Sequence, residues 1–135
     1  TYTATVSDSV IPASKLGRGS RVLIQSIGAR NYYILANFGA AALVAGTATF
    51  TAGVTPIDAL GIDSKMDDGV PNAGKVLSIA IATALPGTAA NSAAAAAMSA
   101  TACYDSTNNR YATVVMNSNT NTDLIVCNLS VRTSF

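Results

Sequence analysis

Hydrophobic and polar positions alternate over several short stretches of this 135-residue chain, a pattern typical of half-buried β-strands. The alternation predicts strands over 1–6, 21–27, 32–37, 40–50, 75–82, 111–116 and 124–131, with an Ala-rich helix as the alternative for 40–50. A Gly-Ala-Arg-Asn turn separates 21–27 from 32–37, so these two strands are expected to form a hairpin. Residues 12–20, 86–102 and 117–123 are rich in small or polar residues and predict loops. One short helical turn is the alternative for 12–20, and a short helix is the alternative within 86–102.

One stretch, 55–66, has the signals of a helix. Thr55 is a suitable N-cap, because its side-chain oxygen can accept a hydrogen bond from an otherwise unpaired N–H of the first turn. Pro56 suits the first helical position, and the Asp58 carboxylate can interact with the exposed N–H groups there. The sequence therefore predicts that a helix begins at Thr55–Pro56.

The face that this helix presents to the rest of the protein is predicted from its apolar spacing. Ala59, Ile62 and Met66 recur at helical intervals and are expected to pack on a sheet, with Asp63 at the polar edge of the stripe. One helix among many strands predicts an α+β fold, predominantly antiparallel β. The length predicts a single globular domain over residues 1–135.

Polar chemistry is concentrated at residues 62–76, which hold three of the seven acidic and two of the eight basic residues. Asp67 and Asp68 can bond back to nearby backbone, and Gly69 tolerates a positive φ. Pro71 prevents further helix, and Gly74 completes a Pro-Asn-Ala-Gly turn. The segment is expected to be a helix end, then a turn, then a strand.

Composition argues against several functions. The formal charge of +1 and the dispersed Lys and Arg residues favour no nucleic-acid partner. The chain has no His, so catalytic arrangements that use a Ser or Cys with a His are impossible. Asp67 and Asp68 are adjacent at a helix end, where two carboxylates rarely face one substrate. We expect no enzymatic activity and no cofactor.

The acidic residues were compared with the helix-loop-helix calcium template. Asp63 and Asp67 fit its first and fifth positions, but Lys65 occupies the third, Asp68 the sixth and Gly74 the twelfth, so the template fails. A looser calcium site at Asp67 and Asp68 remains an alternative. The favoured interpretation is turn formation together with pairing to a nearby Lys.

The two cysteines, Cys103 and Cys127, cannot form a structural zinc site by themselves, and no His is present to complete one. A disulfide between them is the favoured interpretation and would indicate an oxidising compartment. Two buried free thiols are the alternative.

No signal peptide is expected, because 1–6 lacks both a basic region and an apolar region. Residues 32–50 are uncharged but poor in Leu, Ile and Phe, so we expect buried strands there instead of a membrane span.

The polar segment resembles the link from helix to sheet in one branch of bacterial type IV pilin-like proteins, which are filament subunits. That branch carries an Asp-x-Lys-x-Asp-Asp-Gly-x-Pro-x-x-Gly-x-Val run, matched here by Asp63, Lys65, Asp67, Asp68, Gly69, Pro71, Gly74 and Val76. Residues 10–19 are similar to a segment before the first strand in the same branch. Cys103 and Cys127 also resemble the disulfide that closes the terminal region of many pilins.

The resemblance implies a pilin or pseudopilin headgroup, whose partners are identical or homologous subunits of a filament. In this family an N-terminal hydrophobic helix anchors the subunit in the membrane and forms the filament core. That helix is absent from these 135 residues, so we expect a headgroup that contacts the membrane only through it. The implied location is extracellular or at the cell surface, and the periplasmic side of the inner membrane before assembly. The alternatives are a secreted β-rich module that binds calcium, glycan or an apolar ligand, and a virion coat-type assembling protein.

Overall fold

The computed structural model describes residues 13–16, 19–27, 29–38, 50–79, 94–95, 102–113 and 124–133. These residues form one helix and short, mostly antiparallel strands, so the predicted α+β class is confirmed. In chain order the elements are β1 (Ser20–Ile27), β2 (Arg30–Phe38), β3 (Phe50–Thr51), α2 (Pro56–Met66), β4 (Val76–Ser78), β5 (Ala94–Ala95), β6 (Tyr104–Asp105), β7 (Arg110–Tyr111) and β8 (Leu129–Arg132).

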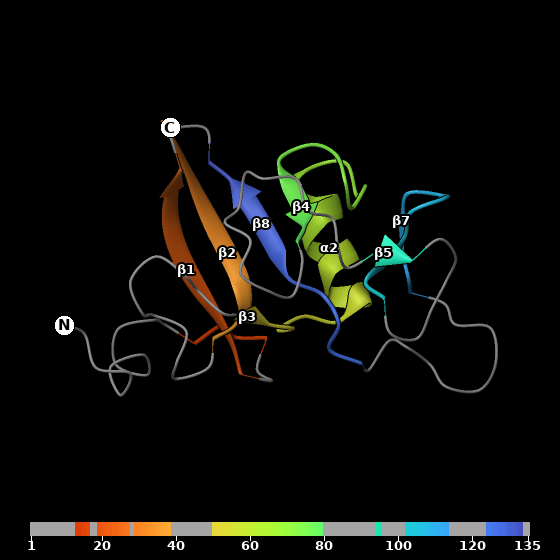
Figure 1. Cartoon of the computed structure of the whole chain (residues 1–135), viewed down its shortest axis with the longest axis horizontal. Coiled ribbons are helices and arrows are strands. Elements are labelled where there is room, and N and C mark those ends of the chain that lie inside the picture. The colour runs from red at the N-terminus through yellow and green to blue at the C-terminus, as the bar shows by residue number, and fades with distance from the viewer. Residues whose placement is uncertain are drawn as a thin grey trace.

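The main sheet has the strand order β1–β2–β8–β4, and each of these pairs is antiparallel (Figure 1). β1 and β2 form the predicted hairpin, but Ile27 pairs directly with Arg30. The connection is therefore shorter than the expected four-residue turn, and Arg30 and Asn31 belong to the second strand. The short strand β3 extends the sheet by pairing with the end of β2.

The register aligns Ile24, Tyr33, Val131 and Val76 in one row across the four strands, so their side chains lie on the same face. Helix α2 packs against the β4 end of this face, where Ala59 is buried in the same core as Val76. Figure 1 shows α2 between the main sheet and the small sheet of β5, β6 and β7.

The opposite face of β2 is also buried. Ile34 and Ala36 are fully inaccessible to solvent, and Leu23 and Ile79 pack against them. A strand covered on both faces needs apolar residues at successive positions, which explains why the run from Tyr32 to Asn37 is almost continuously apolar.

The helix begins where the sequence predicts, and Ala59 and Ile62 of the predicted stripe pack in the core, but Met66 and Asp63 do not lie as expected. Thr55 is the N-cap, its hydroxyl accepts a hydrogen bond from the Asp58 N–H (3.3 Å), and Pro56 is the first helical residue. The prediction that Met66 packs inward and that Asp63 lies at a polar edge is wrong. Met66 is 57% exposed and Asp63 is 0% exposed, so the inward stripe runs from Ala59 to Asp63, one turn apart.

Two predicted strands have different bounds in the structure. Of the described residues 75–79, β4 covers 76–78. β8 covers 129–132, so it begins five residues later and ends one residue later than the predicted 124–131. Residues 126 and 127 instead bond through their N–H groups to the Val54 carbonyl, in the segment that leads into α2. Of the range 86–102, for which the sequence predicts a loop or a short helix, the structure describes only residues 94, 95 and 102, and Ala94–Ala95 forms a strand parallel to β6. The prediction for 86–93 and 96–101 lies outside the described residues. Of the predicted strand over 111–116, only Tyr111 lies in a described strand, as the last residue of β7. The predictions for 1–6, 40–49, 80–82, 114–116 and 117–123 lie outside the described residues.

Candidate functional site

The polar segment connects α2 to β4, and we call residues 63–76 the Asp63–Val76 junction. One oxygen of Asp67, Oδ2, accepts hydrogen bonds from the backbone N–H groups of Lys75 and Val76, the latter at 3.1 Å. These bonds, that of Lys75 first, hold the pKa of Asp67 below its usual value. Gly74 has a φ of +76°, and a Cβ there would overlap the Asp67 carboxylate. The close approach of carboxylate and backbone therefore requires glycine.

The turn after the helix is held by the residues next to Asp67. Asp68 Oδ1 accepts a hydrogen bond from the Val70 N–H (2.9 Å), and Gly69 has a φ of +75°. Pro71 is buried, and its carbonyl accepts a hydrogen bond of 2.7 Å from the Ser78 N–H. Asp68, Gly69 and Pro71 thus lie in the turn after the helix, as the sequence predicts.

Asp63 links the junction to β7. Its Oδ1 accepts the Gly69 N–H (3.2 Å), and its Oδ2 accepts the Tyr111 hydroxyl (2.8 Å). Burial raises the pKa of Asp63, although both hydrogen bonds oppose that rise. Burial, together with the hydrogen bond to Asp63, also raises the pKa of Tyr111. Tyr111 is thus the main partner of the buried carboxylate.

The structure brings Asp63, Asp67 and Asp68 together, with one carboxylate oxygen of each within 4.8 Å of the others. Carboxylate oxygens are ligands for hard cations such as Ca²⁺. Here they also accept protein hydrogen bonds, and only Asp67 Oδ1 and Asp68 Oδ2 accept none from the residues that the structure describes. The hydrogen bonds give each of these carboxylates a role in the turn.

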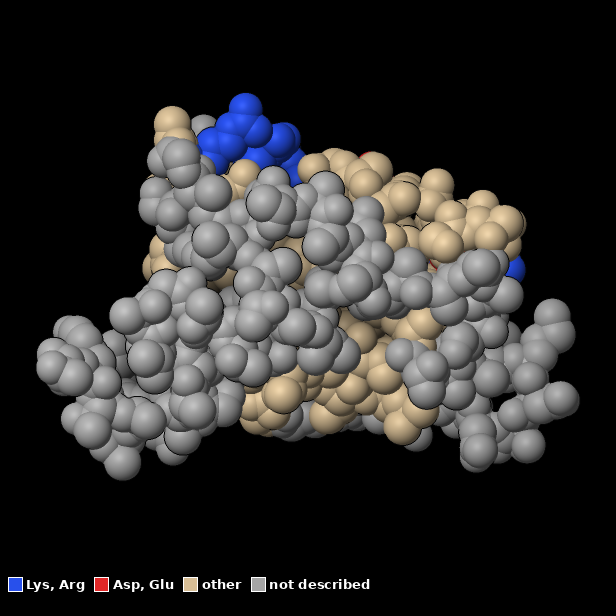
Figure 2. Space-filling view, in the orientation of Figure 1, with Lys and Arg blue, Asp and Glu red and all other residues tan. Residues whose placement is uncertain are grey.

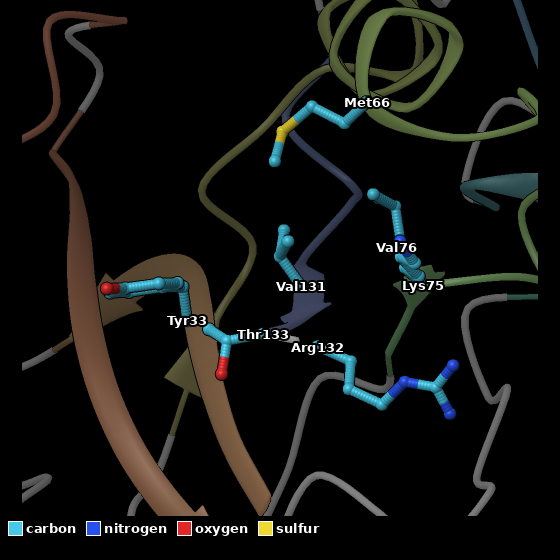
Figure 3. A pocket seen from close by; sticks show the side chains of 7 residues that line it. All are labelled: Tyr33, Met66, Lys75, Val76, Val131, Arg132 and Thr133. Carbon is cyan, nitrogen blue, oxygen red and sulfur yellow. The ribbon is translucent and has the colours of Figure 1, made fainter. Parts of the chain in front are cut away.

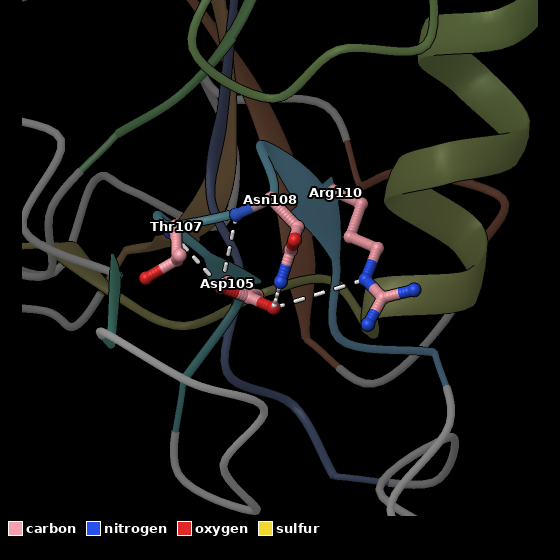
Figure 4. A network of polar contacts seen from close by, with 4 residues as sticks. All are labelled: Asp105, Thr107, Asn108 and Arg110. Carbon is pink, nitrogen blue, oxygen red and sulfur yellow. Dashed lines mark hydrogen bonds and ion pairs between the residues drawn. The ribbon is translucent and has the colours of Figure 1, made fainter.

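A second polar network lies in the loop between β6 and β7 (Figure 4). Asp105 Oδ1 accepts the N–H groups of Thr107 (2.9 Å) and Asn108 (3.2 Å), and its Oδ2 accepts the Asn108 side-chain amide (2.7 Å). Arg110 forms an ion pair with the same carboxylate at 3.7 Å. These contacts, the Asn108 side chain first, lower the pKa of Asp105. Asp105 and Asn108 are therefore turn residues.

Besides the pairing of β6 with β5, side-chain contacts attach the β6–β7 hairpin and the residue before it to the rest of the protein. The Asn72 side-chain amide donates to Asn109 Oδ1 (2.8 Å), and the Tyr111 hydroxyl reaches Asp63. Cys103 and Cys127 form a disulfide with a Cα–Cα distance of 4.9 Å, and both residues are buried. The disulfide connects the residue before β6 to the segment that pairs with Val54 beside α2.

Sequence reasoning identified the turn residues of the junction but missed two long-range contacts to it, from Tyr111 and Asn109. One local signal for the first was available. Asp63 follows Ala59 by four residues, so a buried Ala59 implies a carboxylate facing inward, which needs a hydrogen-bond donor. The sequence does not show which donor is used.

Comparison with protein families, curated proteins and solved structures found no match to this chain. Among the residues that the structure describes, no helix has the length and apolar content needed to cross a bilayer.

Proposed function

We propose that this chain is the globular head domain of a type IV pilin-like or pseudopilin subunit. It would act by self-assembly and surface contact in an extracellular filament or a secretion pseudopilus, without chemistry of its own. Its partners would be identical or homologous subunits, at the cell surface after assembly.

The observation that carries the proposal is the role of the Asp63–Val76 junction. The run that resembles the pilin-like pattern forms the joint between the helix and the sheet, and its acidic, Gly and Pro residues each have a structural task there. These roles, which hold one layer of the fold on another, suit a structural subunit. The α+β architecture and the Cys103–Cys127 disulfide are compatible with an exported subunit.

The test is expression of the gene with its native upstream codons, followed by electron microscopy with an antibody against this domain. Labelled surface filaments are expected. A matched strain that lacks the upstream codons controls for filaments of other origin, and should show none that are labelled. Protein that stays inside the cell, with no labelled filament, would contradict the proposal.

One observation favours a second candidate, a secreted calcium-binding module. Three carboxylates lie within 4.8 Å of one another in the junction. Calorimetric titration with calcium, described in the Discussion, separates this candidate from the first.

A further inference from the structure

A hollow of about 240 Å³ lies where the C-terminal end of α2 meets the sheet (Figure 3). Its lining comes from β2, α2, β4 and β8 and the residues next to them: Tyr33, Met66, Lys75, Val76, Val131, Arg132 and Thr133. Val76 and Val131 supply apolar walls, and the exposed Met66 stands at the helix side of the hollow. The hollow can therefore accept an apolar side chain.

The apolar surface continues from the hollow away from the helix. Along the row of paired residues, Val76 is buried, Val131 is half-buried, Tyr33 is 37% exposed and Ile24 is 66% exposed. Exposure rises because α2 covers only the β4 end of this face. Large exposed apolar residues in a continuous row are a common mark of an interaction surface.

The rim of the hollow is basic. Lys75 and Arg132 line it, and Arg30 begins the strand next to β8 at the same end of the sheet, because β2 and β8 are antiparallel. Figure 2 shows Lys and Arg side chains gathered at this edge of the molecule. Asp67 interacts with Lys75 and Arg132, and Asp63 and Asp68 lie beside Asp67. None of these three carboxylates lines the hollow, whereas Lys75 and Arg132 do.

The N-terminal end of α2 carries an exposed apolar side chain and a negative charge, which complement the apolar walls and basic rim of the hollow. Ile57 is 50% exposed there, and the neighbouring Asp58 carries a negative charge in the first helical turn. Leu124 is 46% exposed and comes three residues before Cys127, which pairs with Val54 just ahead of the helix. An 11-residue helix separates the two ends by about 16 Å.

We propose that these two ends dock on each other in successive copies of the chain, with Ile57 of one copy in the hollow of the next and Asp58 facing Lys75 and Arg132. This inference rests on the proposed function and names the surfaces of its subunit contact. A contact between two different surfaces gives an open-ended array when its rotation does not close into a ring, and a filament requires such an array. A symmetric contact of hollow on hollow would place like charges together and is disfavoured.

The test uses filaments assembled from the gene with its native upstream codons. Asp58→Lys and Arg132→Asp each place like charges across the proposed contact. Either variant alone should lower the amount of filament at least about tenfold, because like charges at an interface are costly. When both variants are co-expressed, each end meets an opposite charge on the other variant, so filament formation should recover.

Lys15→Asp is the matched control. It makes the same change in charge as Arg132→Asp at an exposed position before β1, the strand farthest from α2 in the sheet order, and should leave filament yield unchanged. If both single variants form as much filament as the wild type, this contact is overturned while the proposed function stands. Failure of the co-expressed pair to recover would also overturn it. Absence of wild-type filaments would remove the proposed function and this inference together.

Discussion

The hydroxyl of Tyr111 donates a 2.8 Å hydrogen bond to the buried carboxylate of Asp63, which is 48 positions earlier in the chain. The contact connects α2 to β7 and places a carboxylate next to the core that contains Ala59 and Tyr111. A buried carboxylate that keeps its donors is tolerated, whereas one that loses a donor is costly.

Tyr111→Phe removes this donor and leaves the rest of the ring in place. At neutral pH we expect it to lower the free energy of unfolding by about 1.5–3 kcal/mol, the range for hydrogen bonds to charged groups. Urea unfolding followed by circular dichroism measures the loss. Tyr32→Phe, at a half-buried position of β2, is the control and should change stability by less than about 0.5 kcal/mol. Equal effects of the two substitutions would show that the Tyr111 contact contributes nothing.

Asp63→Asn tests the charge of the same group. Because burial raises the pKa of Asp63, its protonated form favours the fold, and this contribution is lost as the pH rises through the folded-state pKa. The variant should therefore gain stability relative to wild type as the pH rises from about 4 to about 7. Asp67 and Asp105 act in the opposite direction, since their lowered pKa values give stability that is lost as the pH falls. Unfolding curves over this range check the slope, and a difference that is constant with pH would contradict the assignment.

Gly74→Ala should be strongly destabilising, by more than about 2 kcal/mol, because it combines a positive φ with overlap of the Asp67 carboxylate. Gly61→Ala is the natural comparison. Gly61 lies within α2 with open space around its Cα, so alanine should stabilise the helix by about 0.5–1 kcal/mol. Thermal melting of the two variants should shift the midpoint in opposite directions. A Gly74→Ala protein as stable as wild type would refute the role given to this glycine.

The Cys103–Cys127 disulfide should be present in protein produced in an oxidising compartment. Intact mass under non-reducing conditions is expected to be about 2 Da below the all-thiol value, from the loss of two hydrogens. Replacement of both cysteines by serine should cost about 3 kcal/mol in the chain-entropy model, given their sequence separation of 24. Two thiols that react with an alkylating reagent in the folded protein would exclude the bond.

Calcium should bind weakly if at all, because the junction carboxylates already accept protein hydrogen bonds. Calorimetric titration is expected to show no binding tighter than about millimolar, the range of weak extracellular sites. A micromolar site that disappears in Asp68→Ala would instead support the calcium-binding module.

Sequence by itself determined the features that depend on neighbouring residues. Thr55 and Pro56 start the helix through bonds within its first turn, and Asp68, Gly69 and Pro71 end it through a local turn. The β1–β2 hairpin was also predictable, because alternation and the intervening glycine act over a short range. The resemblance that suggests a filament subunit is likewise a property of the sequence.

Tertiary structure decided which side of the helix faces inward and where the strands end. Helical periodicity allows either Met66 or Asp63 to continue the stripe from Ala59, and the partner supplied by β7 selects Asp63. The 124–131 strand is shortened because the N–H groups of 126 and 127 bond to Val54, a partner more than 70 residues away. The basic hollow likewise exists only once β2, β4 and β8 are aligned beside α2. Such contacts join distant parts of the chain, so local pattern carries no information about them.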